Sequence, residues 1–326
     1  MRICIVGAGA IGGFCGALFA RAGHEVSLVA RGAHLEALRL RGLTLESEGR
    51  RETFRLPAAA DPAEFGAQDL VLLALKAYSI APMLERMRPI VGAQTMVVPA
   101  LNGLPWWYFH REGGRFDGEP IACLDPGGRM FASLDPACLV GCVVHAAAEV
   151  TEPGVVRHTA GRRFVLGEPD GSDSERLRRL AGAMQAAGFE VRTSGRIRDE
   201  VWMKLIGNLS YNPVAALTLA RMDDIHANPA LLELIGAMMR ESMRVAEAYG
   251  VRIGVSVEER IGIARRIGNA KVSMHQDIER GRPLEIEAIV GSVMELAARA
   301  GVATPMIDAV HALLAERARH AGPAGG

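Results

Sequence analysis

A row of three polar side chains in an apolar stretch is the part of this sequence best suited to chemistry. Lys204, Asn208 and Asn212 follow one another at intervals of four residues, so a helix places them on one face. Their neighbours are apolar, which indicates a sheltered place where an amine and two amides are costly unless something polar binds. There, a cationic lysine can stabilise negative charge developing on a bound oxygen and donate a proton to it. The alternative is a polar stripe on the surface.

The start of the sequence has a second functional pattern, a glycine-rich turn between a predicted strand, 2–6, and a predicted helix, 11–22. In the G-x-G-x-x-G spacing, the first glycine permits the turn, the second lets a pyrophosphate approach the backbone, and the third lets the helix lie close to the strand. The helix N-terminus offers N–H groups to phosphates. The pattern predicts a dinucleotide site, with a purely structural turn as the alternative. The predicted contact residues are Gly7, Ala8, Gly9, Ala10, Ile11 and Gly12.

The residue after the second predicted strand, 25–29, indicates which dinucleotide binds. An NAD site usually has a carboxylate here for the ribose 2′-hydroxyl, whereas this chain has Arg31. A guanidinium matches a 2′-phosphate in charge and in the geometry of its donors. We therefore expect NADP (NADPH) as the cofactor. The alternative is an exposed arginine without a ligand.

Composition excludes several classes of protein. The 326 residues contain 37 Lys plus Arg and 37 Asp plus Glu, so no basic field indicates a nucleic-acid partner. No apolar run reaches the length of a membrane span, and the chain enters a strand at once without a signal peptide. We therefore expect a cytoplasmic protein without a membrane or nucleic-acid partner.

The cysteines do not predict a metal site or a disulfide framework. There are five, an odd number, and most lie in apolar runs, so we expect reduced, buried thiols. Cys138 and Cys142 are spaced like a metal-binding pair, but no matching pair of Cys or His lies nearby. We expect no metal.

The first part of the chain predicts an α/β fold. Near-continuous apolar runs at 69–75 and 95–101 suit strands buried on both faces, with a helix at 78–88 between them. Turn residues within 139–167 suggest antiparallel strands added at one edge of the sheet. A helix at 174–187 and a strand at 189–193 follow. We expect an NADP-binding Rossmann-type, doubly wound domain over residues 1–194.

From residue 195 onward only helices are predicted. Asn228-Pro229 begins one helix, Ser256 and Glu259 form a capping box for another, and Thr304-Pro305 begins the last. A further helix at 285–300 ends at Gly301, and five methionines at helical spacing, Met238, Met239, Met243, Met294 and Met306, are expected in the core. Residues 320–326 are expected to be a disordered tail. We expect an all-helical substrate and catalytic domain over residues 195–326.

Six short motifs, in order along nearly the whole chain, resemble those of the ketopantoate reductases (2-dehydropantoate 2-reductases). Their consistent spacing is more specific than any one of them. The motifs are GAGAIG at 7–12 with Arg31, Leu75-Lys76-Ala77, Leu101-Asn102-Gly103, Trp202-Met203-Lys204 with Asn208 and Asn212-Pro213, Ser273-Met274-His275-Gln276-Asp277, and Glu285-Ile286-Glu287.

The resemblance implies NADPH-dependent reduction of 2-dehydropantoate to pantoate, for pantothenate and coenzyme A synthesis. Lys204 matches the general acid that protonates the substrate carbonyl. The residues that the resemblance implies in substrate binding are Asn102, Asn208, Asn212 and Ser273, the serine through the substrate carboxylate. Those that it implies in cofactor binding are Lys76, Asn102, Ala147, through its backbone, and Glu285, which also contacts substrate. Glu287, two residues on, is expected to point elsewhere.

Some residues depart from the family pattern. Two further asparagines of the family fall on Met222 and Ala270, and a bulky insert, Trp106-Trp107-Tyr108, follows Asn102-Gly103 beside the expected cleft. These differences concern the identity of the 2-keto acid more than the chemistry. A reductase of another branched or aromatic 2-keto acid is therefore the alternative.

A protein of a different class, a sensor that binds NADP without turnover, is the third interpretation. It would lack an acid in the cleft, which the Lys204 row argues against. Histidine-based dehydrogenation is disfavoured, because His145 and His275 are more simply packed or surface residues. The sequence gives no oligomeric state and leaves a homodimer open.

Overall fold

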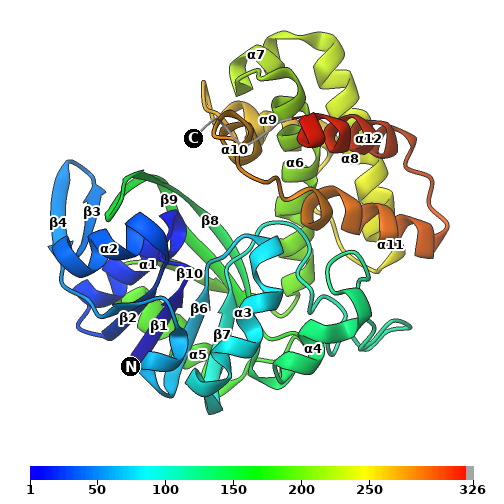
Figure 1. Cartoon of the computed structure of the whole chain (residues 1–326). Helices are drawn as coiled ribbons and strands as arrows, with labels where there is room; N and C mark the ends of the chain where they lie inside the picture. The colour runs from blue at the N-terminus through cyan, green and yellow to red at the C-terminus, as the bar shows by residue number, and fades with distance from the viewer. Residues whose placement is uncertain (321–326) are drawn as a thin grey trace. The chain divides into compact units, whose positions relative to one another are not determined.

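The computed structural model describes residues 1–320, and the chain forms two compact units (Figure 1). Unit 1 comprises residues 1–101, 107–120 and 127–197. Unit 2 comprises residues 102–106, 121–126 and the described residues from 198 onward.

A five-stranded parallel sheet in unit 1 follows from the apolar runs of the sequence. The strand order is β5-β2-β1-β6-β7, and four of the five residues of β1 are buried, as expected of strands covered on both faces. The prediction of a Rossmann-type sheet is confirmed. The strands are β1 (Arg2–Val6), β2 (Glu25–Val29), β5 (Ala58–Ala59), β6 (Gln68–Leu73) and β7 (Val91–Pro99).

Helix α1 (Ala10–Arg21) packs between this sheet and a second one, because it contacts strands of both. Its sequence is apolar nearly all round, as a helix buried on opposite faces requires. Phe14 and Phe19 are fully buried, with ring centroids 6.0 and 5.2 Å from that of Phe189. Burying each such ring stabilises the unit by about 1.5–3 kcal/mol, and the packing fixes the turn before α1.

The second sheet corrects one prediction. Strands β8 and β9 form the expected antiparallel hairpin, but they belong to a separate sheet of order β10-β9-β3-β4 with β8 beside β9, and one isolated bridge, Val97 to Leu139, links β7 to the chain before β8. Strands β3 and β4 were not predicted, because their hairpin is mostly polar. The strands are β3 (Leu43–Ser47), β4 (Arg50–Phe54), β8 (Gly141–Glu152), β9 (Val155–Gly167) and β10 (Glu190–Thr193).

The remaining helices of unit 1 are short. The helix expected at 78–88 is divided into three pieces, η2, α3 and η3. The elements are α2 (Gly32–Arg41), η1 (Pro62–Phe65), η2 (Ala77–Ser79), α3 (Ala81–Met87), η3 (Arg88–Ile90), α4 (Arg129–Ser133), η5 (Pro136–Cys138) and α5 (Glu175–Ala186). A further turn, η4 (Pro126–Gly128), spans the two units.

Unit 2 is helical, as predicted, and its helix ends carry the expected caps. The Asn228 side chain accepts from the backbone of Ala230 and Leu231, and Ser256 and Glu259 form a capping box. Gly301 ends α11 with φ +69°. The elements are α6 (Ile197–Thr218), α7 (Met222–Ala227), α8 (Pro229–Ala248), α9 (Val257–Arg265), α10 (Ser273–Glu279), the π-turn η6 (Glu287–Gly291), α11 (Ser292–Ala300) and α12 (Pro305–His320).

Two predictions about unit 2 need qualification. Met238 and Met239 are fully buried, but Met306, expected in the core, is 39% exposed, because the first turn of α12 presents it to solvent. The expected tail at 320–326 falls almost wholly outside the described residues, since only His320, the last residue of α12, is described.

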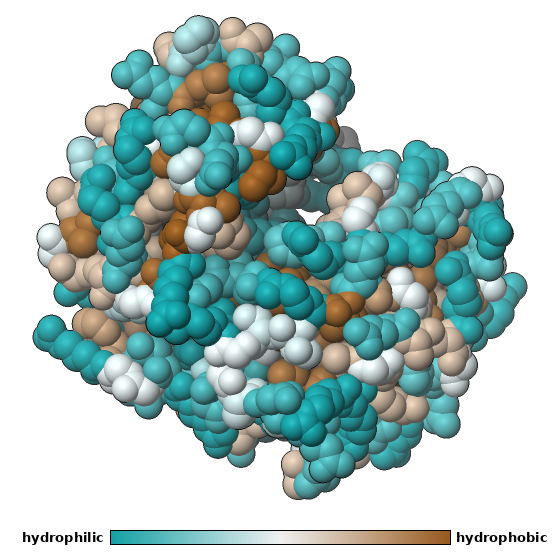
Figure 2. Space-filling model, turned by 180° about the vertical axis from the view of Figure 1, so that it is seen from behind, coloured by the Kyte–Doolittle hydropathy of each residue, from teal (hydrophilic) through white to brown (hydrophobic). Residues whose placement is uncertain are grey.

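The prediction of buried thiols is confirmed only in part. None of the five cysteines forms a disulfide; Cys4, Cys15 and Cys142 are buried, whereas Cys123 and Cys138 are half-buried. Residues 1–320 contain no group of three His, Cys, Asp or Glu able to hold a metal ion. No helix in the described part is long and apolar enough to cross a membrane. Hydrophilic residues cover much of the face shown in Figure 2, with apolar residues among them, as is ordinary for protein surfaces.

Candidate functional site

The glycine-rich turn has the geometry that its spacing predicts. Gly7 adopts φ +97°, and a Cβ there would lie 2.5 Å from the Ala74 carbonyl oxygen. A Cβ on Gly12 would lie 2.0 Å from the Gly7 carbonyl oxygen, so only glycine lets α1 approach the turn. A Cβ on Gly9 would have no described atom within 4 Å. The fold therefore requires glycine at positions 7 and 12, whereas Gly9 leaves open space in front of the helix.

Two backbone amides of this turn are already bonded inside the protein. The amides of Gly7 and Ala8 donate to the Val29 carbonyl at 3.1 and 2.9 Å. The amides of residues 10–12 form the first turn of α1, and such groups have no intrahelical partner. These three amides are therefore the candidates for phosphate binding, and the backbone N–H of Ala8 is not.

A histidine that was not predicted as a site residue, His34, supports the turn. His34 of α2 is 2.8 Å from the Ala8 carbonyl oxygen through Nε2, and the Gly154 amide donates to its Nδ1 at 3.1 Å. Because Nδ1 accepts, Nε2 carries the proton and donates to Ala8. The ring thus ties the turn to the β8–β9 hairpin. No motif marked His34, since its partners come from distant segments.

Arg31 and Lys76 lie at the same edge of the parallel sheet as the turn. Arg31 is exposed at the start of α2, just after β2, and half-buried Lys76 precedes η2, just after β6. Strands β2 and β6 both pair in parallel with β1, so their carboxyl ends adjoin the turn. Ala147 instead lies exposed in β8 of the second sheet.

In unit 2, the Lys204 amine meets the Asn102 side chain. Lys204 Nζ donates to Asn102 Oδ1 at 2.8 Å, and the pair is partly buried. Along α6, Lys204 and Asn208 are half-buried and Asn212 is buried, so the row is sheltered rather than a surface stripe. The structure brings together two residues that are 102 positions apart in the sequence.

A close backbone contact holds Asn102 in this position. The next residue, Gly103, has φ +84°, and a Cβ there would lie 2.1 Å from the Ala288 carbonyl oxygen. The Leu104 amide donates to the same oxygen at 2.8 Å. Ala288 lies within the π-turn η6, a distortion often found at functional sites. The π-turn therefore acts as the docking point for the segment that carries Asn102.

A second contact attaches residues 121–126 to unit 2. Glu295 of α11 is half-buried. Its carboxylate accepts hydrogen bonds from the backbone amides of Ala122 and Cys123, both at 2.8 Å. Burial alone raises the pKa of this carboxyl. The hydrogen bonds from the two amides, the Cys123 thiol and Arg299 together outweigh burial, so the pKa lies below its usual value. The expected boundary at residues 194 and 195 assigned both segments to the first domain. It was wrong there, because long-range contacts, not chain order, join them to the helices.

Glu285 and Glu287 have different surroundings, as expected. Glu285 is 6% exposed just before the π-turn. The Glu287 side chain is 58% exposed and lies 3.8 Å from the His311 ring. Ser273 is half-buried as the first residue of α10. Only the first of these two carboxylates is sheltered enough for a site.

The residues that depart from the family pattern are buried or bonded within the protein. Met222 is 1% exposed, and its amide donates to the Ala270 carbonyl at 3.1 Å, so the two replaced asparagine positions are neighbours. Trp106, Trp107 and Tyr108 are at most 3% exposed. The aromatic insert is therefore buried rather than exposed on the surface.

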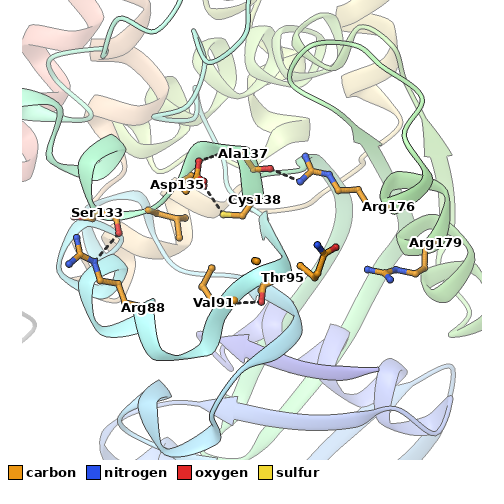
Figure 3. A pocket seen from close by; sticks show the side chains of 13 residues that line it. Arg88, Val91, Thr95, Ser133, Asp135, Ala137, Cys138, Arg176 and Arg179 are labelled. Atoms are coloured by element: carbon orange, nitrogen blue, oxygen red, sulfur yellow. Dashed lines mark hydrogen bonds between the residues drawn. The ribbon is translucent and has the colours of Figure 1, made fainter.

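A pocket of about 450 Å³ lies elsewhere in unit 1, between the start of β7, α4, η5 and α5 (Figure 3). Parallel pairing of β1, β6 and β7 puts it at the opposite end of the sheet from the glycine turn. Arg176 is engaged there by Glu168 at 2.5 Å and by the Leu139 carbonyl at 3.1 Å. Burial and Asp135 raise the pKa of Cys138 to about 12, so its thiol stays protonated. Arg176 is thus held by partners within unit 1.

Comparisons with known proteins agree with this geometry. Residues 3–106 match the family model described as ketopantoate reductase PanE/ApbA, and residues 196–318 match the model of its C-terminal domain. The chain is 47% identical to a 2-dehydropantoate 2-reductase from Mesorhizobium japonicum, covering 96% of this chain and 97% of that protein. This chain belongs to the ketopantoate reductase family. It is thus an oxidoreductase, as predicted.

Solved structures support the same assignment. A crystal structure from Ralstonia solanacearum MolK2 has a TM-score of 0.94 with this chain at 40% identity and covers 99% of both chains. A 2-dehydropantoate 2-reductase from Geobacter metallireducens GS-15 has a TM-score of 0.85 at 30% identity, covering 97% of this chain and 99% of that one. The family assignment therefore extends over both units.

Proposed function

We propose that this chain reduces 2-dehydropantoate to pantoate with NADPH, and that Lys204 is the general acid. The observation that carries the proposal is the partly buried hydrogen bond of 2.8 Å from Lys204 to Asn102, within a family whose relatives include named 2-dehydropantoate 2-reductases. NADPH, when bound, supplies the hydride. The residues of the protein supply orientation, charge and the proton.

The Lys204 amine suits the role of acid for three reasons. Its ammonium form is a cationic donor with three protons, and it can donate one of them to a substrate oxygen. The bond to Asn102 fixes the direction of the flexible lysine side chain. As the carbonyl carbon receives hydride, negative charge grows on oxygen, and the ammonium both stabilises that charge and transfers a proton to it. The amine then regains a proton from solvent.

The other polar residues of unit 2 are proposed to hold the substrate. Asn208 and Asn212 lie one and two turns beyond Lys204 on α6 and can bond oxygen atoms of the substrate. The hydroxyl of Ser273 is proposed to bond the carboxylate. Glu285, buried before the π-turn, is proposed to contact both substrate and cofactor.

The residues of unit 1 fit an NADP dinucleotide. The open space at Gly9 and the first-turn amides of α1 suit a pyrophosphate. The exposed guanidinium of Arg31 suits a 2′-phosphate, and Lys76 adds a second cation at the same sheet edge. Asn102, although part of unit 2, and Ala147 are also proposed as cofactor contacts.

A second candidate is the reduction of another branched 2-keto acid. Met222 and Ala270, in contact through their backbones, favour it because they supply no side-chain amide where the family pattern has asparagines. Steady-state kinetics with 2-dehydropantoate and with other branched and aromatic 2-keto acids decide between the candidates. We expect the highest kcat/KM for 2-dehydropantoate. A higher value for another acid would replace the substrate, and no reduction of any acid would favour a sensor.

A further inference from the structure

A polar cluster in unit 2 has donors and charges that the proposed reaction does not use. It consists of Tyr211 on α6, His226 on α7, and Arg260 and Arg265 on α9, helices that Figure 1 shows within the helical unit. Tyr211 Oη lies 3.4 Å from His226 Nε2, and their ring centroids are 5.5 Å apart. Both arginines lower the pKa of Tyr211, which burial raises to about 12. The four side chains thus share one electrostatic environment.

Arg260 is a largely buried cation without a counterion in the described part of the chain. It lies against α6 at Gly207, where a Cβ would be 2.0 Å from its Nη2. Its Nε is buried and has no hydrogen-bond partner among residues 1–320. Burial lowers its pKa, which Tyr211 partly offsets. A buried guanidinium of this kind is costly unless an anion pairs with it.

His226 provides a second unpaired group in the same cluster. Its Nδ1 is buried and has no partner within the described residues. Burial and then Arg265 lower the pKa of His226, against the opposing effect of Asp223, so the ring is neutral at pH 7. When the Tyr211 hydroxyl donates to Nε2, the ring proton is on Nδ1, which becomes a donor.

We propose that Arg260 and His226, with Arg265, bind the anionic group of a small ligand, a phosphate or a carboxylate. One anion accepts hydrogen bonds from Arg260 Nε and His226 Nδ1 and neutralises the excess charge of the cluster. Gly207 and Tyr211 lie about 5 and 10 Å beyond Lys204 along the axis of α6. The side chains that would hold the anion, Arg260, Arg265 and His226, do not include any of the proposed substrate residues, so the proposal does not depend on the reductase reaction.

Calorimetric titration of the full chain with inorganic phosphate and, separately, with acetate tests the proposal, with chloride as the reference salt. We expect saturable binding of one of the probes and a change in the ring ¹⁵N shifts of His226, assigned with a His226→Gln variant. Tighter binding of phosphate would assign a phosphate group, and tighter binding of acetate a carboxylate. No saturable binding of either probe would overturn the proposal.

Variants locate the bound anion. Arg260→Leu is expected to weaken binding at least tenfold, without lowering the Tm in anion-free buffer, because it removes an unpaired buried charge. Arg266→Gln, at the exposed end of the same helix, is the matched control and should bind as the wild type does. Unchanged binding in Arg260→Leu, weakened binding in Arg266→Gln, or a Tm of Arg260→Leu below that of the wild type without anion would contradict the assignment.

Discussion

The docking of Gly103 on Ala288 predicts that one added methyl group at this position disturbs the Lys204–Asn102 pair. In Gly103→Ala, the Cβ would start 2.1 Å from the Ala288 carbonyl oxygen, so the backbone must move by about 1 Å to restore ordinary contact. A displacement of that size in a catalytic group costs roughly a hundredfold in rate. The positive φ of +84° adds about 1–2 kcal/mol of strain for a residue with a Cβ.

Steady-state kinetics and thermal unfolding check this prediction. We expect kcat/KM for 2-dehydropantoate to fall roughly a hundredfold, while the Kd of NADPH changes little, because the glycine turn and Arg31 carry most of that binding. Gly113→Ala is the matched control: it has a similar φ of +77° but no described atom within 4 Å of the added Cβ. It therefore carries the backbone strain without the clash. A normal kcat/KM in Gly103→Ala, or an equal loss in Gly113→Ala, would refute the positioning role.

Three further variants test the remaining assignments. Arg31→Ala should reduce the preference for NADPH over NADH by about 1.5–3 kcal/mol, the range of a charge-assisted hydrogen bond; equal binding of both cofactors by the wild type would contradict NADP specificity. Glu285→Ala should lower kcat/KM by at least about tenfold, whereas Glu287→Ala, 58% exposed, should be near normal, and equal effects would mean that the wrong glutamate was chosen. Glu295 has a lowered pKa, despite the opposing effect of burial, so its carboxylate stabilises the fold above its ordinary pKa of 4.5 and loses this as pH falls through the lower folded value. Unfolding of Glu295→Gln should therefore be less acid-dependent than that of the wild type below that pH, and an unchanged pH profile would remove the carboxylate from the linkage.

The local elements of the fold could be predicted because short-range rules determine them. The β1–turn–α1 unit, the cap at Asn228 and the capping box at Ser256 all depend on residues within a few positions of one another. The shelter of the Lys204 row followed from apolar neighbours at helical spacing. These features need no knowledge of distant contacts.

The features that could not be predicted all depend on long-range pairing. The separate second sheet requires a mostly polar hairpin, β3–β4, to pair with the distant strand β9, and the alternation in this hairpin is limited to the short run of residues 43–46. His34 contacts Ala8 and Gly154, which lie in different segments. Trp107 was expected beside a cleft, but its ring packs at Gly141. Aromatic composition alone does not distinguish a substrate pocket from a core.

The turnover of Lys204→Ala measures whether Lys204 is the general acid. The Kd of NADPH should stay near the wild-type value, because the glycine turn and Arg31, which are proposed to carry most of the dinucleotide binding, make no hydrogen bond to this amine. kcat for 2-dehydropantoate should fall about a hundredfold or more, the usual loss when a positioned acid or an oxyanion donor is removed, and the loss should be in kcat rather than only in KM. Lys271→Ala, which removes an ion pair with Glu279, is the control and should retain its kcat. Tight NADPH binding with near-normal kcat in Lys204→Ala would contradict the account.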